Sequence, residues 1–214
     1  PPYPTWVRTR PGGSSGRTDR QPTRCGGMDQ QLVVRVQGGD QRAFEALVVA
    51  DQARLYRLAY GILRDPQLAE DATQQALLDI WRDVGRLRDP AKYEGWSYRL
   101  LVRVCYAEAK RQQEWTTSHD LPSAAEPRAA DVYGGVADRD QLERGFRRLS
   151  MDHRVVLALR HLLGMTPDQM AVVLDLPRST IYSRLQAAMK AMRAALEAEG
   201  RSSTVTLERQ EAVR

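Results

Sequence analysis

The sequence predicts an all-α protein in which a flexible linker joins two small helical domains, the second of them containing a helix-turn-helix. Apolar residues recur at helical spacing in separate segments between residues 41 and 196, and runs of β-branched residues are few. Residues 114–138 carry Pro and Gly among small and polar residues, a composition that is typical of a linker.

The two ends of the chain lack the helical pattern. Residues 1–27 are rich in Pro, Gly, Ser, Thr and Arg, so we expect a disordered extension there, and residues 198–214 are expected to form a polar tail. Of the 214 residues 42% are hydrophobic, which is enough for a buried core. The net charge of +5 fits a polyanionic partner such as nucleic acid without requiring one.

The chain carries no motif that indicates catalysis. Cys25 and Cys105 fit neither a disulfide framework nor a metal-ligand spacing, and the three histidines are scattered. We therefore expect no catalytic residue, metal, cofactor or small-molecule substrate, and a reducing cytoplasm is the simplest location. No segment has the length and apolarity of a membrane span or signal peptide, so we expect no membrane insertion.

The first two helices of the N-terminal domain are predicted over residues 41–63 and 66–85. Asp65 can cap the second helix, with Pro66 at its first position. Small and aliphatic residues at helical spacing face inward from that helix. Its outward face places an aliphatic side chain among polar ones: Asp71, Gln74, Gln75, Leu78 and Arg82. One exposed leucine is ordinary, so Leu78 gains meaning only beside these neighbours.

A third helix, over residues 92–112, is predicted to bury Tyr93, Leu100, Leu101, Val104 and part of Trp96. Its opposite side is basic and aromatic, because Lys92, Arg99, Arg103, Tyr106 and Lys110 fall within one narrow sector. Such a face can hold a phosphate backbone while its rings stack on unpaired bases. A solvated basic helix is the alternative interpretation.

The helix-turn-helix is predicted near the C-terminus, after a helix over residues 151–163. Thr166 and Gln169 have the spacing of a capping box, with Pro167 in the first helical turn. The first helix of the pair ends at a turn over residues 175–177, because the residue before a proline disfavours the helical conformation. The second helix is predicted to begin at Pro177 or Arg178.

This second helix has one apolar stripe, formed by Ile181, Leu185, Ala188, Met192 and Leu196. The far side is small and polar and suits the major groove, with Ser179, Tyr182, Ser183, Gln186 and Lys190. Arg178 and Arg184 lie on the flanks, where they can reach phosphates. Any small helical bundle also has a stripe and a polar exterior. The short serines and the lack of acidic residues over residues 178–196 argue against that alternative.

Three blocks in this order resemble the extracytoplasmic-function sigma factors of the sigma-70 superfamily, which direct bacterial RNA polymerase to promoters. Residues 39–47 resemble the family's opening helix, and residues 69–77 resemble its AED-x-x-Q block, which contacts core polymerase. The resemblance covers about residues 28–196. It implies a core-polymerase face composed of Asp71, Gln74, Gln75, Leu78 and Arg82.

Residues 95–111 are similar to the family segment that opens and binds the −10 element as single-stranded DNA. Arg103 stands where the family has Asn, and Ala107 where it has Asp, so base preference is carried over less securely than DNA contact. The resemblance implies these −10 contacts: Lys92, Trp96, Arg99, Arg103, Tyr106, Lys110 and Arg111.

Residues 149–160 and the helix-turn-helix resemble the family's −35-binding domain. The implied −35 contacts are Arg178, Ser179, Thr180, Tyr182, Ser183, Arg184, Gln186 and Lys190. The implied domains are residues 28–113, for polymerase and the −10 element, and residues 139–197, for the −35 element. The resemblance further implies an anti-sigma factor as a partner beside core RNA polymerase and promoter DNA.

Two other classes of protein stay open on the residues alone. A stand-alone helix-turn-helix repressor would have no need of the outward face over residues 71–82. An enzyme carrying an incidental helix pair would need a catalytic constellation, and the sequence offers none.

Overall fold

The computed structural model describes residues 29–118 and 136–211, with side chains for residues 29–115 and 141–198. Every regular element in these two ranges is helical, as predicted. The helices are α1 (Gln30–Gln37), α2 (Gln41–Leu63), α3 (Pro66–Asp83), α4 (Tyr93–Ser118), α5 (Val136–Arg147), α6 (Met151–His161), α7 (Pro167–Leu174) and α8 (Arg178–Glu211), with short 3-10 helices η2 (Val84–Arg86) and η3 (Pro90–Lys92) between α3 and α4. The predicted N-terminal extension and most of the predicted linker lie outside the described residues.

The helix starts follow local capping chemistry. The Asp65 carboxylate accepts a hydrogen bond of 2.9 Å from the Leu68 amide, so α3 begins at Pro66 as predicted. Thr166 and Gln169 form the predicted reciprocal capping box of α7. Asp175 ends α7 in the left-handed conformation, with φ of 54°, and α8 begins at Arg178.

Helices α1 to α4 form an N-terminal unit around an aliphatic core. The inward stripe predicted for α3 is buried, and its alanines let α2 and α3 pack closely. Leu47, Leu55 and Ile62 of α2 are fully buried, each stabilising the fold by about 1.5–3 kcal/mol. Helix α1 was not among the predicted elements, although Val33 and Val36 bury one face of it.

A buried polar cluster fixes α4 against α2. The Asp51 carboxylate accepts hydrogen bonds of 2.8 Å from the Tyr93 hydroxyl and from Arg54. Arg54 also donates to the Tyr98 hydroxyl at 3.0 Å and pairs with Glu94. Burial raises the pKa of Asp51, while the neighbouring Arg54 guanidinium opposes that rise. The cluster therefore sets the rotation of α4 about its axis and with it the direction of the basic face.

Helices α5 to α8 form a C-terminal unit. Val155, Val156 and Leu159 of α6 pack with the predicted stripe of α8, in which Ile181 and Ala188 are fully buried. Helix α8 continues to Glu211, so residues 198–211, predicted as a polar tail, belong to the same helix. Its sequence contains no proline that would stop it.

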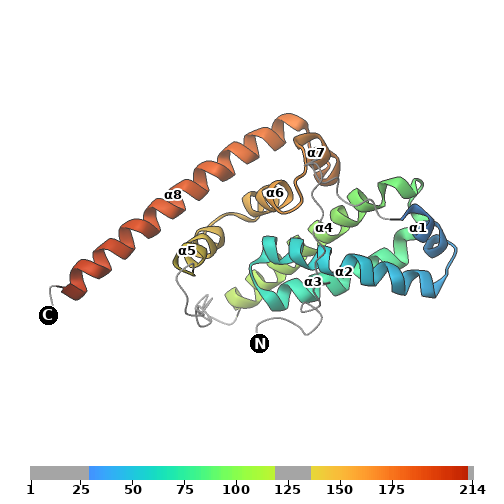
Figure 1. Cartoon of the computed structure of the whole chain (residues 1–214), viewed down its shortest axis with the longest axis horizontal. Helices are drawn as coiled ribbons and strands as arrows, with labels where there is room; N and C mark the ends of the chain where they lie inside the picture. Colours follow the sequence, from blue (N-terminus) through green and yellow to red (C-terminus); the bar gives the residue numbers. More distant parts are fainter. Residues whose placement is uncertain (1–28, 119–135, 212–214) are drawn as a thin grey trace, which may run out of the picture.

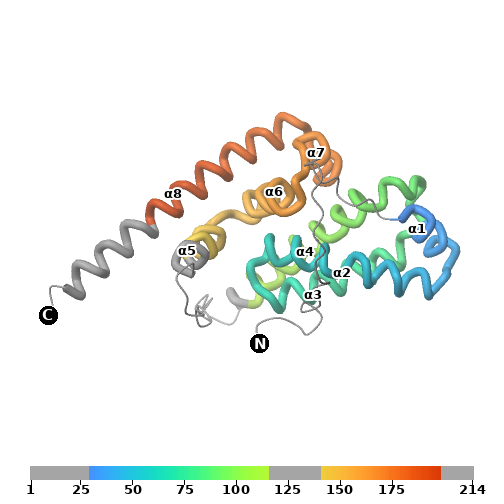
Figure 2. Tube along the Cα trace, in the orientation of Figure 1, coloured from blue at the N-terminus to red at the C-terminus, as the bar shows by residue number. Residues whose placement is uncertain are grey.

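The two units lie against each other. Helix α6 lies beside α2, and α7 lies beside α4, as Figure 1 and Figure 2 show. Arg99, on the basic face of α4, therefore lies against α7 of the helix-turn-helix.

Candidate polymerase and nucleic-acid interfaces

The outward face of α3 exposes all five side chains that the sequence predicted for polymerase binding. Leu78, at the centre of this face, is 60% exposed. Beside it the Gln75 amide donates a hydrogen bond of 3.0 Å to the Asp79 carboxylate. The same face contains Trp81, which is 41% exposed and packs on Phe44 of α2. Trp81 was not among the predicted contacts, although its position three residues after Leu78 places it on the same side of the helix.

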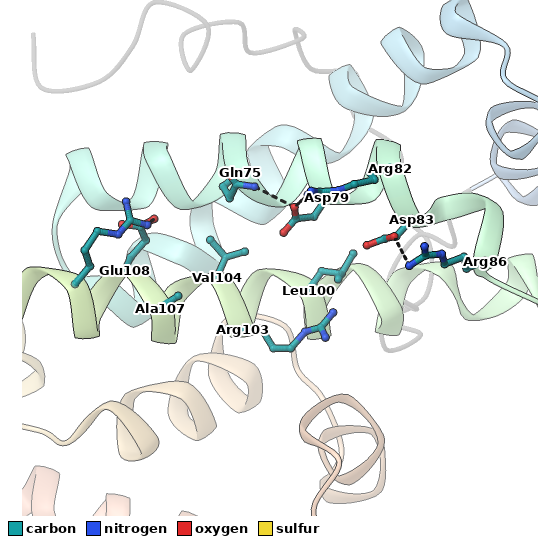
Figure 3. Close-up of a pocket in the computed structure, with 11 residues that line it drawn as sticks. Gln75, Asp79, Arg82, Asp83, Arg86, Leu100, Arg103, Val104, Ala107 and Glu108 are labelled. Atoms are coloured by element: carbon teal, nitrogen blue, oxygen red, sulfur yellow. Dashed lines mark hydrogen bonds and ion pairs between the residues drawn. The ribbon is translucent and has the colours of Figure 1, made fainter.

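An open groove of about 600 Å³ runs between α3 and α4 and connects the α3 face with the basic side of α4 (Figure 3). Three carboxylates in it pair with arginines one turn away, as Asp83 does with Arg86 at 3.0 Å. Arg103 stands in the groove and forms no ion pair with any described residue. Ala107, where the family has Asp, leaves the neighbouring wall small and uncharged.

The seven predicted −10 residues divide into three pairs and the single residue Trp96. Arg103 and Arg111 line the groove with α3. Lys92 lies in η3 and Lys110 near the end of α4, where each pairs with a carboxylate on its own helical turn. Arg99 and Tyr106 face the C-terminal unit, where Arg99 donates to the carbonyls of Val172 and Val173 and the Tyr106 hydroxyl donates to the Asp152 carboxylate at 2.6 Å. Trp96 is half-buried against Tyr93, with ring centroids 6.0 Å apart.

The predicted −35 residues lie along the first half of α8, and six of them are exposed: Arg178, Ser179, Tyr182, Ser183, Gln186 and Lys190. Arg178 pairs with Asp168 of α7 at 3.1 Å and donates to the Tyr182 hydroxyl at 3.2 Å. The hydrogen bond to Tyr182 raises the pKa of Arg178. Arg184 is half-buried and turns toward Asp152 of α6.

Comparison with known proteins identifies the fold's relatives. Two family models match: Sigma-70 region 2 over residues 47–116 and Sigma-70, region 4 over residues 139–192. The chain is 29% identical over 187 residues to the RNA polymerase sigma-H factor of Pseudomonas aeruginosa, covering 79% of this chain and 94% of that protein. It is 27% identical over 176 residues to the ECF RNA polymerase sigma-E factor of Escherichia coli K12, covering 77% of this chain and 92% of that protein.

Two solved structures share the fold. The structure of CnrH in complex with the cytosolic domain of CnrY matches with a TM-score of 0.60 at 20% identity, covering 79% of this chain and 97% of that one. The sigma factor RpoE of Bartonella quintana, solved with the anti-sigma factor NepR, matches with a TM-score of 0.59 at 18% identity. The match covers 72% of this chain and 96% of that one.

The chain belongs to the sigma-70 family, within its extracytoplasmic-function group. It is a promoter-recognising factor that binds RNA polymerase and takes part in transcription initiation. Among the described helices none has the length and apolarity needed to cross a membrane.

Proposed function

We propose that the outward face of α3 binds core RNA polymerase, through Asp71, Gln74, Gln75, Leu78 and Arg82, with Trp81 as a further contact. The exposed leucine and tryptophan carry this proposal, because large apolar side chains surrounded by polar ones are typical of interface centres. The residues 28–113 form the polymerase-binding and −10-binding domain in this account.

The first half of α8 binds the −35 element as duplex DNA. Ser179, Ser183 and Gln186 are short or adaptable side chains that can approach base edges, and Arg178 and Lys190 can reach phosphates. Helix α7 crosses above the DNA backbone, as the first helix of such a motif does. Residues 139–197 form this second domain.

The basic side of α4 binds the −10 element as a single strand. Arg103, in the open groove, is available for a base or phosphate because no described carboxylate neutralises it. Trp96 and Tyr106 supply rings for stacking on unpaired bases. The protein performs no catalysis itself; it positions the polymerase, and it does so in the cytoplasm, where the DNA is.

An anti-sigma factor is the expected regulatory partner. The two structurally similar chains were solved with the cytosolic domain of CnrY and with the anti-sigma factor NepR, respectively. A partner of that kind would cover the polymerase and DNA faces described above.

Selection of DNA from a pool of genomic fragments tests the assignment. Fragments bound by the protein with core polymerase should share two spaced motifs, one contacted as duplex and one opened. Fragments bound without polymerase should share the −35 motif alone. An identical single motif under both conditions, with no opened DNA, would instead support a stand-alone repressor.

A further inference from the structure

Arg178 is the first residue of α8, and Asp168 and Tyr182 hold its guanidinium in place. Its Nε atom lies 3.1 Å from the carboxylate of Asp168, which belongs to the first turn of α7. Its Nη2 atom donates a hydrogen bond of 3.2 Å to the Tyr182 hydroxyl, and its Cζ atom lies 5.5 Å from the centroid of the Tyr182 ring. Both helices of the helix-turn-helix therefore fix the position of this one side chain.

Part of the guanidinium stays available in this arrangement. A guanidinium has five N–H donors, and the contacts with Asp168 and Tyr182 engage Nε and one proton of Nη2. Nη1 forms no hydrogen bond or ion pair with any residue that the structure describes. The protons of Nη1 and the remaining proton of Nη2 are neighbouring donors in one plane, and such a pair matches the O6 and N7 acceptors of guanine in the major groove.

The place of Arg178 in the fold indicates a role other than helix stability. A positive charge in the first turn of a helix is unfavourable, because the N-terminus of a helix carries partial positive charge. The Arg178 and Asp168 side chains are 60% and 62% exposed, and ion pairs as exposed as this add little stability. The first residues of a recognition helix are those that contact base edges. The remaining donors of Arg178 are therefore accessible where DNA is contacted.

The Asp168 carboxylate favours a base over a phosphate as the target of Arg178. The flank position of Arg178 alone allows a phosphate contact. A phosphate, however, is bound mainly through positive charge, and the Asp168 carboxylate neutralises that charge and repels the DNA backbone. A base edge carries no net charge, so binding it requires correctly placed donors rather than an unpaired cation.

We propose that Arg178 contacts a guanine of the −35 element, and that Asp168 and Tyr182 are positioning residues that orient its guanidinium for this contact. The proposal rests on the −35 role proposed above for α8 and specifies one base that the helix selects. It also brings Asp168, which was not among the predicted −35 contacts, into DNA recognition. An arginine that is held before binding loses less conformational entropy when it meets the base, so the guanine contact is stronger.

The first test measures base preference. The full chain bound to core polymerase selects duplexes from a library that is randomised across the −35 region, and competition binding then compares the selected duplex with its single-base variants. We expect one G·C pair at which the preference disappears in Arg178→Ala, with binding of the selected duplex weakened by about tenfold. Lys190→Ala is the matched control, because it removes one positive charge from the same helix and should weaken binding of all duplexes alike.

The second test measures the positioning role. Asp168→Ala should reduce the preference at the same G·C pair. It should also raise the magnitude of the slope of log affinity against log salt concentration by about 1, because the released Arg178 can then contact a phosphate. Tyr182→Phe removes only the hydroxyl and should reduce the preference too, whereas Asp168→Glu keeps the carboxylate and should retain it. Glu197→Ala removes an exposed carboxylate from the same unit and should change neither the preference nor the slope.

The stability of the helix-turn-helix is controlled separately. A carboxylate in the first turn of α7 also stabilises that helix, so unfolding of Asp168→Ala is followed in parallel by circular dichroism. A weakened helix-turn-helix lowers affinity for all duplexes alike and leaves the ratio between bases unchanged. A uniform loss of this kind in Asp168→Ala, with the guanine preference intact, would overturn the role of Asp168 in positioning.

The outcomes for Arg178 distinguish the proposal from the function on which it rests. A loss spread equally over all bases in Arg178→Ala, as in Lys190→Ala, would place Arg178 on a phosphate and overturn the proposal. An unchanged guanine preference in both Asp168→Ala and Tyr182→Phe would overturn the positioning role. If the wild-type protein with core polymerase selects no duplex motif at all, the assignment of α8 to the −35 element is itself wrong.

Discussion

Phe44 and Trp81 place their ring centroids 4.6 Å apart, with the rings tilted by 48°. This pair joins α2 to the outward face of α3 and holds the indole beside Leu78. The Trp81 side chain is 41% exposed, so it offers a large apolar area to a partner. Because Phe44 already holds one side of the ring, the side chain loses little conformational entropy on binding. The α3 face is therefore organised before any partner arrives.

Replacing Trp81 by alanine should weaken binding to core polymerase by about tenfold, since truncation of a central aromatic typically costs more than about 1 kcal/mol. The measurement is titration of labelled protein with core polymerase, followed by fluorescence anisotropy. Trp115→Ala removes an exposed tryptophan from the end of α4 and should leave this affinity unchanged. Equal losses in the two variants would remove Trp81 from the interface.

Gln186 and Lys190 lie one turn apart on α8, and both are exposed. Gln186→Ala should change which −35 sequence is preferred, because an amide contacts base edges. Lys190→Ala should weaken binding to all DNA sequences alike, because a phosphate contact does not depend on the base. It should also reduce the slope of log affinity against log salt concentration by about 1, because each phosphate contact releases a counterion. Competition binding with −35 variants at several salt concentrations distinguishes the two. A uniform loss for Gln186→Ala would exclude it from base contact.

The Asp51 cluster should dominate the stability of the N-terminal unit. Tyr93→Phe leaves one Asp51 oxygen without its donor and should lower the free energy of unfolding by about 1–3 kcal/mol. Asp51→Ala removes one of the two carboxylates that pair with the largely buried Arg54, leaving Glu94, and should lower the free energy of unfolding by about 1–3 kcal/mol.

Urea unfolding monitored by circular dichroism measures both variants. Tyr60→Phe is the matched control, since the Tyr60 hydroxyl forms no described hydrogen bond, and it should change stability by less than about 0.5 kcal/mol. A Tyr93→Phe protein as stable as the control would mean that the cluster does not hold α4.

Local rules were sufficient for much of the fold. The caps Asp65 and Thr166, the inward stripe of α3 and the start of α8 follow from interactions within a few residues, and the structure confirms them. The exposure of the α3 face follows from the same periodicity. Helix α1 and the continuation of α8 were missed because an eight-residue helix has little periodicity and a polar helix has none to detect.

The positions of Arg99 and Tyr106 had no local signal. Their partners lie far along the chain, in α7 and α6, and the contacts depend on how the two units pack. Helical spacing grouped both residues with Arg103 on one side of α4, whereas in the structure Arg103 lines the groove with α3. It could not show that the C-terminal unit covers part of that side, since packing between units is set by shape and by contacts such as that of Gly61 with Leu162.

Run-off transcription by bacterial core polymerase shows whether initiation at a promoter depends on the α3 face. The templates are promoters from the chain's own genomic neighbourhood, and the proteins are the wild type, the Asp71→Arg and Leu78→Ala double variant, and Val49→Ala as an exposed apolar control on α2. We expect initiation that depends on the wild-type protein, is kept by Val49→Ala and is lost by the double variant. DNA binding without initiation, or full initiation by the double variant, would contradict it.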